Sequence, residues 1–94
     1  MSGTTRSSEG LDERRRRLLF RAWHRGMREV DLITGRFADA HIGTLTGAEV
    51  AEFERLMDAP EPDLLNWVMG AAEIPASHDT PLFRRLCEFH RGAA

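Results

Sequence analysis

Apolar residues that recur every three or four positions are the feature that most limits what this chain can fold into. Five successive segments carry this helical pattern, as in Leu18, Leu19, Ala22 and Trp23 of the first one. No segment alternates apolar and polar residues in the way that a half-buried strand does. The sequence therefore predicts an all-α fold, a small bundle of about five short helices.

Capping and helix-breaking residues set the bounds of these segments. The third segment has the clearest signal, because Thr46-Gly47-Ala48-Glu49 is a capping box whose hydroxyl and carboxylate satisfy free backbone donors. Proline in a first turn and glycine after a last turn mark the other ends. We expect helices from about Asp12 to Arg25, between Gly26 and Gly43, from the Thr46 cap to before Pro60, from Pro62 to before Gly70, and from Thr80-Pro81 to before Gly92.

The chain has the length of one small domain. Its 94 residues leave no room for a second hydrophobic core, at ~100–200 residues per domain. Residues 1–10 are rich in Ser, Thr and Gly and are expected to be a disordered leader, with residues 11–92 as a single helical domain. A domain of this size buries only ~60–65% of its unfolded surface, so a large internal cofactor cavity is not expected and function should lie on the surface.

Cysteine usage and the lack of long apolar runs indicate the compartment. Cys87 is the only cysteine and cannot close an internal disulfide, which favours a reducing environment. No apolar run approaches the ~20 residues that span a bilayer, and the first residues lack the apolar region of a signal peptide. We therefore expect a cytoplasmic protein with no membrane partner.

The residues that several reactions need are missing or scattered. All 13 basic residues are Arg, so the lysine of a P-loop or of a Schiff-base enzyme cannot be supplied. The four His residues lack metal-ligand spacing, and no two carboxylates are placed to divide acid and base roles. Cys87 and His90 share a helix face without a third orienting group, which favours an ordinary buried thiol. We expect no catalytic residue, no metal site and no cofactor bound by this chain.

Charge is unevenly distributed along the chain. Residues 1–28 carry eight Arg and three acids, whereas residues 29–94 carry five Arg and twelve acids. A basic end can bind nucleic acid or an acidic protein. However, the four consecutive residues Arg14-Arg15-Arg16-Arg17 point around most of a helix circumference and cannot form one phosphate-binding stripe. We favour a solvated helix face and expect no nucleic-acid partner.

Residues 23–31 contain the densest group of distinctive side chains and allow two interpretations. In the first, Gly26 is a helix junction, Arg25 and Glu29 form an ion pair across it, and the Trp and Met of this stretch belong to the core. In the second, Gly26 lets the backbone of a partner approach closely, while Arg25, Arg28 and Glu29 present charges for recognition. The physical properties of these residues leave both interpretations open.

The same stretch resembles the RGxxE signature of the SdhE family in the residues Arg25-Gly26-Met27-Arg28-Glu29. Members of this family are succinate dehydrogenase assembly factors that promote covalent flavin attachment. The resemblance continues through Val30-Asp31, residues 35–39 and the capped third segment to Pro62-Asp63-Leu64-Leu65-Asn66-Trp67. It covers roughly residues 14–70, and the two motifs together are more specific than the RGxxE signature alone.

The resemblance implies a small five-helix protein that binds the flavoprotein subunit of succinate dehydrogenase, and often that of fumarate reductase. In that family the new bond joins FAD to a histidine of the partner. This chain would therefore donate no catalytic group and bind no cofactor itself, so it would be an assembly factor and not an enzyme. We expect it to be a monomer when free.

Site roles also follow from the resemblance, position by position. Three residues correspond to the functional residues of the RGxxE signature, and four neighbours are assigned to the same partner-binding surface. The first group is Arg25, Gly26 and Glu29, and the second is Trp23, His24, Met27 and Arg28.

Other classes of protein remain open at this point. Members of the SdhE family have also been labelled antitoxins, so the chain could be a regulatory protein-interaction module of antitoxin type without a flavoprotein client. A nucleic-acid binder would use the basic first segment and would lose affinity steeply with salt. An independent flavin-binding enzyme would be yellow when purified.

Overall fold

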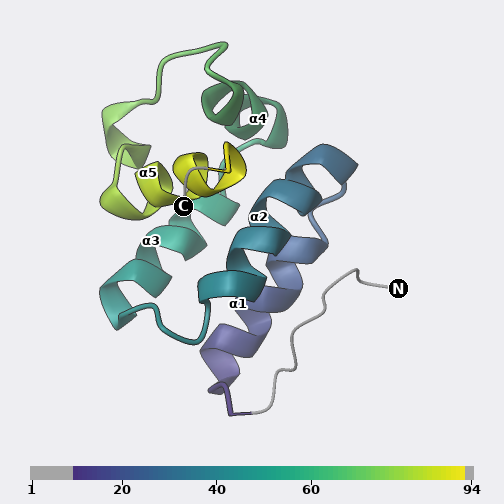
Figure 1. Cartoon of the computed structure of the whole chain (residues 1–94), viewed down its shortest axis with the longest axis vertical. Coiled ribbons are helices and arrows are strands. Elements are labelled where there is room, and N and C mark those ends of the chain that lie inside the picture. The colour runs from purple at the N-terminus through teal and green to yellow at the C-terminus, as the bar shows by residue number, and fades with distance from the viewer. Residues whose placement is uncertain (1–9, 93–94) are drawn as a thin grey trace.

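The computed structural model describes residues 10–92, so the expected leader lies outside the described residues except for Gly10. The described part of the chain forms five α-helices, one short 3₁₀-helix and no strand, which confirms the all-α prediction. None of these helices has the length and apolar character needed to cross a bilayer. The bounds are α1 Glu13–Trp23, α2 Arg28–His41, α3 Gly47–Met57, α4 Glu61–Met69, η1 Ala76–His78 and α5 Pro81–His90 (Figure 1).

Side-chain caps begin three of the helices where the sequence predicts them. The Asp12 carboxylate accepts a hydrogen bond from the Arg15 backbone N–H at 2.8 Å, and Thr80 Oγ1 accepts one from the first turn of α5 at 3.1 Å. In α3 the capping box is complete, because the Glu49 N–H donates to Thr46 Oγ1 and the Thr46 N–H donates to Glu49 Oε1. These bonds satisfy backbone donors that would otherwise lack partners.

The helices pack around one apolar cluster with α2 near its centre. α1 and α2 lie side by side, α5 packs against both α2 and α3, and α4 contacts α2 (Figure 1). The ring of Phe37 on α2 meets Phe53 and Phe89 edge-on, with centroids 5.7 and 5.8 Å apart. The position of α2 is therefore fixed by contacts with the other helices, and its first turn carries Arg28 and Glu29, the last residues of the candidate site.

A glycine and a threonine allow α1 and α2 to approach closely. The side chain of Trp23, at the end of α1, packs against Gly35 of α2, where a Cβ atom would overlap the indole ring. The hydroxyl of the buried Thr34 donates to the Ala22 carbonyl oxygen at 2.5 Å. Gly35 weakens the sequence-based prediction of α2, yet the close packing of the two helices requires it.

The arginine run of α1 is engaged with carboxylates of the chain itself. Arg14 Nη2 donates to Glu54 Oε1 of α3 at 2.7 Å, and Arg15 Nη1 donates to Asp12 Oδ2 at 2.6 Å. Farther along the helix, Arg17 Nε lies 3.6 Å from Glu13 Oε2, in the first turn of α1. Three of the four arginines are exposed, which agrees with the solvated face that we favoured, and the structure adds ion pairs that the sequence did not indicate.

Candidate functional site

The loop that joins α1 to α2 contains the RGxxE residues and turns at a glycine. α1 ends at Trp23, about two residues before the expected end, and His24 is its C-cap. Gly26 has a φ of +115°, which residues with a Cβ atom rarely adopt. α2 begins at Arg28 with Met27 as its N-cap. The structure thus shows the helix junction that the sequence indicated at Gly26.

Two carboxylates hold the backbone of this loop. The Arg25 N–H donates to Asp31 Oδ1, from the first turn of α2, at 2.7 Å. The Met27 N–H donates to Glu61 Oε2, from the start of α4, at 2.9 Å. Hydrogen bonds to charged acceptors are stronger than those between neutral groups. The loop backbone is therefore fixed by one hydrogen bond to α2 and one to α4.

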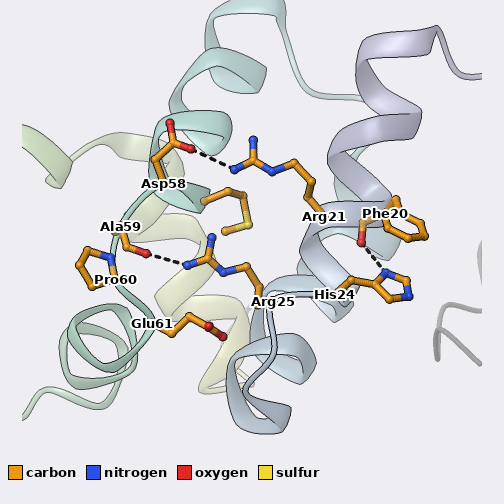
Figure 2. A pocket seen from close by; sticks show the side chains of 9 residues that line it. Phe20, Arg21, His24, Arg25, Asp58, Ala59, Pro60 and Glu61 are labelled. Atoms are coloured by element: carbon orange, nitrogen blue, oxygen red, sulfur yellow. Dashed lines mark hydrogen bonds and ion pairs between the residues drawn. The ribbon is translucent and has the colours of Figure 1, made fainter.

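The side chain of Arg25 points toward the segment between α3 and α4. Its Nη2 donates to the Ala59 carbonyl oxygen at 2.6 Å, and Figure 2 shows Glu61 beside the same guanidinium. Burial lowers the pKa of Arg25, and the Glu61 carboxylate acts in the opposite direction. Arg25 Nε is buried and has no hydrogen-bond acceptor among the described residues. A buried donor without a partner costs free energy.

The two charged side chains that directly follow the loop form no hydrogen bond or ion pair with the described residues. Arg28 and Glu29 occupy the first turn of α2, and both are exposed. The ion pair between Arg25 and Glu29, which our first interpretation expected, is not formed in the described part of the chain, because Arg25 reaches Ala59 instead. That part of the first interpretation is wrong. Glu29 is left available to a partner.

The remaining predicted site residues differ in exposure. Trp23 lies in the core at 8% exposure, and its Nε1 donates to Asp39 Oδ1 at 3.1 Å. Met27 is partly buried against the core. His24 is exposed, and its ring stacks on Phe20 with centroids 3.9 Å apart. Trp23 therefore anchors the end of α1 in the core, next to the loop, whereas the ring of His24 is exposed to solvent.

A cavity of about 370 Å³ opens beside the loop, between α1 and the start of α4. On one side of it, Arg21 Nη2 donates to Asp58 Oδ1 at 3.0 Å (Figure 2). Phe20 is 63% exposed at its edge. The cavity combines charged groups with an exposed ring, a mixture that suits contact with a protein surface. Its lining consists of Phe20, Arg21, His24, Arg25, Met57, Asp58, Ala59, Pro60 and Glu61.

Sequence reasoning did not find Phe20, Asp58 or Glu61 as site residues. Glu61 contacts a residue 34 positions earlier, and its only local signal is that an acid is favourable in the first turn of a helix. Phe20 could have been suspected, because it follows two buried leucines and falls on the polar side of α1. Nothing near Asp58 in the sequence links it to α1.

The His and Cys residues considered for metal binding or catalysis can be located in the described part of the chain. No cluster of three or more His, Cys, Asp or Glu that could hold a metal ion occurs between residues 10 and 92. Cys87 is buried in α5, and burial raises the pKa of its thiol, which keeps it protonated. His90 is exposed. The prediction of an ordinary buried thiol at Cys87 is confirmed.

The fold and the loop together define a small helical protein whose distinctive feature is a helix junction held by hydrogen bonds to α2 and α4. Residues 16–90 match the Sdh5 family, which is described as the flavinator of succinate dehydrogenase. Because this match covers most of the chain, the chain belongs to the Sdh5 family, and the resemblance inferred from the RGxxE residues is confirmed.

Curated relatives agree with this assignment. The chain is 39% identical over 85 residues to the FAD assembly factor SdhE of Acetobacter pasteurianus, covering 90% of this chain and 78% of the relative. It is 34% identical over 80 residues to the mitochondrial succinate dehydrogenase assembly factor 2 of Dictyostelium discoideum, covering 85% of this chain and 56% of the relative. The chain thus spans little more than half of that mitochondrial relative. No solved structure gives a significant match.

Proposed function

We propose that this chain is an assembly factor that binds the flavoprotein subunit of succinate dehydrogenase and promotes covalent attachment of FAD to that subunit. The family description and the names of the relatives support this proposal. The observation that carries it is the junction loop, whose backbone is held by Asp31 and Glu61 while Glu29 stays free at the surface. A fixed loop beside an unpaired charge is suited to recognise a partner.

The proposed mechanism is a shift in the conformation of the client. The new bond joins FAD to a histidine of the client, and this chain contributes no reacting atom and is not an enzyme. It binds the client form in which FAD and that histidine are placed for reaction more tightly than the open form. The population of the reactive form then rises by the ratio of the two affinities. Because the loop is preset, little conformational entropy is lost when it binds.

Of the charged side chains of the motif, Arg25 holds the loop and Glu29 is suited to contact the client directly. Arg25 donates to the Ala59 carbonyl oxygen, and its Nε is buried and out of reach of the client. The exposed carboxylate of Glu29 would pair with a cation of the client. Removing one member of a desolvated charge pair costs about 2–5 kcal/mol of binding free energy. We therefore expect Glu29→Ala to weaken client binding by that order if water is excluded from the contact.

The finer features of this function follow the same family. We propose that the chain acts in the cytoplasm, is a monomer when free, and also serves the flavoprotein subunit of fumarate reductase. The first relative is a bacterial FAD assembly factor, which supports the cytoplasmic location over a mitochondrial one. Comparing covalent flavin on both flavoproteins in cells without this chain would show whether it has one client or two.

The proposal is tested in cells that lack the chain. Covalent flavin on the large flavoprotein subunit is measured by in-gel fluorescence after restoring wild type, Glu29→Ala or Glu88→Ala at matched levels. Glu88 is exposed on α5 and lies outside the site, so it controls for the loss of a surface carboxylate. We expect wild type and Glu88→Ala to restore the fluorescence and Glu29→Ala to fail. Normal fluorescence without any copy of the chain would refute the function.

A further inference from the structure

A second, more apolar groove borders the same motif. It has a volume of about 340 Å³ and lies between α2, α4 and the end of α5. Four of its lining side chains are apolar, and three charged or titratable side chains surround them. The apolar residues are Leu32, Ile33, Leu65 and Met69, and the others are Glu29, Arg36 and His90.

The groove explains what the apolar run of α4 does. Leu64, Trp67 and Val68 point inward and are buried. Leu65 and Met69 are four positions apart, so they lie on one face of the helix, and that face lines the groove. Met69 is 61% exposed, and within residues 10–92 Phe20 is the other large hydrophobic residue that is exposed. Leu65 and Met69 share one apolar lining with two residues of α2, and a contiguous apolar surface rimmed by charged groups is typical of a binding surface.

Charges at the groove define the chemistry of what fits there. Glu29 and Arg36 are seven positions apart on α2, which places them on one face roughly 10 Å from each other along the helix axis. Neither side chain forms an ion pair within the described residues. A ligand segment would therefore need an apolar side chain between a basic group facing Glu29 and an acidic group facing Arg36.

Glu29 belongs both to this groove and to the RGxxE residues, so the groove continues the surface proposed to bind the client. We infer that the groove receives an apolar side chain of the flavoprotein client, next to a basic residue that pairs with Glu29. This inference rests on the proposed function. Charge complementarity favours this occupant, because Glu29 and Arg36 border the groove without an ion pair within the described residues and Glu29 is shared with the motif.

The test measures affinity between the purified chain and the purified flavoprotein subunit of succinate dehydrogenase. Met69→Glu places a charge in the groove, and because Met69 is exposed the variant should fold. Ala48→Glu is the matched control, since it adds the same charge at an exposed position in the first turn of α3. We expect Met69→Glu to weaken binding about tenfold or more and Ala48→Glu to change it less than about twofold.

Glu29→Ala separates this inference from the proposed function. Weakened binding by Glu29→Ala together with unchanged binding by Met69→Glu would overturn the groove and leave the function standing. Unchanged binding by Glu29→Ala would instead count against the motif surface and against the groove with it. Equal losses for Met69→Glu and Ala48→Glu would also overturn the groove, as a general effect of charge. A wild-type dimer that Met69→Glu dissociates, with client binding unchanged, would assign the groove to a second copy and refute our assignment.

Discussion

The Glu61 carboxylate accepts a hydrogen bond from the Met27 backbone N–H at 2.9 Å, although the two residues are 34 positions apart. Arg25 makes a second link between the same regions by donating to the Ala59 carbonyl oxygen. The start of α4 and the residues before it therefore form a support for the loop that contains the RGxxE residues. Rigidity of this loop is a property of tertiary structure, and it can be changed without touching the motif.

Replacing Glu61 should loosen the loop while leaving the motif intact. Glu61→Ala removes the charged acceptor of the Met27 N–H, and the free energy of unfolding should fall by about 1.5–3 kcal/mol. Hydrogen exchange at the Met27 amide should become faster than it is in wild type. Exchange at amides in the middle of α2 should change less. Glu61→Gln keeps an acceptor oxygen, so it should restore part of the protection. Unchanged exchange in Glu61→Ala would show that the bond does not hold the loop.

Gly26→Ala and Gly26→Arg separate backbone strain from blocked approach. A Cβ atom at position 26 would lie 3.5 Å from Glu61 Oε1, an ordinary contact, so the φ of +115° is the main obstacle. Both variants should lose about 1–3 kcal/mol of unfolding free energy in urea titrations. Gly26→Arg should in addition lose client affinity, because its long side chain prevents close approach. Equal client affinity for the two variants would remove close approach from the account.

Gly35→Ala tests the packing of α1 on α2. Its Cβ atom would overlap the buried ring of Trp23, which cannot move aside easily, and overpacking of this kind costs about 1–3 kcal/mol. Gly47→Ala is the control, because a Cβ atom there meets open space and alanine is favoured in a helix. Thermal unfolding should show a lower Tm for Gly35→Ala and an equal or higher Tm for Gly47→Ala. A Tm for Gly35→Ala matching wild type would contradict this packing.

Stability should depend on the protonation of His41. Its ring packs against Phe37 and Phe89, and burial, followed by the nearby Arg85, lowers its pKa in the folded state. The unfolded chain, with a His pKa of about 6.5, then binds the proton more readily. His41 therefore contributes full stability above about pH 6.5, and this contribution declines as the pH falls through the lowered folded pKa.

Urea unfolding from about pH 8 to about pH 5 measures this dependence. His41→Phe, which keeps an aromatic ring at the position, should flatten the fall in stability across that range. Glu49 also has a lowered pKa in the folded state, but its contribution is lost only at more acidic pH, below about 4.5. The same slope in wild type and His41→Phe would show that another group is responsible.

The helices could be predicted from the sequence because their signals are local. The Thr46 and Glu49 capping box spans four residues, and the apolar periodicity needs only a few helical turns. The short helix Ala76–His78 was not predicted, since it has three residues and no side-chain cap. Gly26 could be identified as a junction because glycine readily adopts a positive φ.

The contacts that shape the site could not be predicted in this way, because they join distant parts of the chain. No pattern near Gly35 shows that Trp23 will pack on it, so the glycine resembled a defect in the helix. Arg25 and Glu29 have the spacing of a helical ion pair, yet Arg25 reaches Ala59, because Arg25 lies in the loop before α2 and the two residues do not share a helix. Tertiary contacts decided the direction of the Arg25 side chain.

We propose that the junction loop makes the client reactive, while the bond-forming atoms belong to the client and FAD. The most direct measurement is the rate of covalent FAD incorporation into the purified flavoprotein subunit, with and without this chain. We expect wild type and Glu88→Ala to accelerate incorporation equally, and Glu29→Ala to leave the rate near that of the subunit with FAD alone. Equal rates with and without the wild-type chain would contradict this proposal.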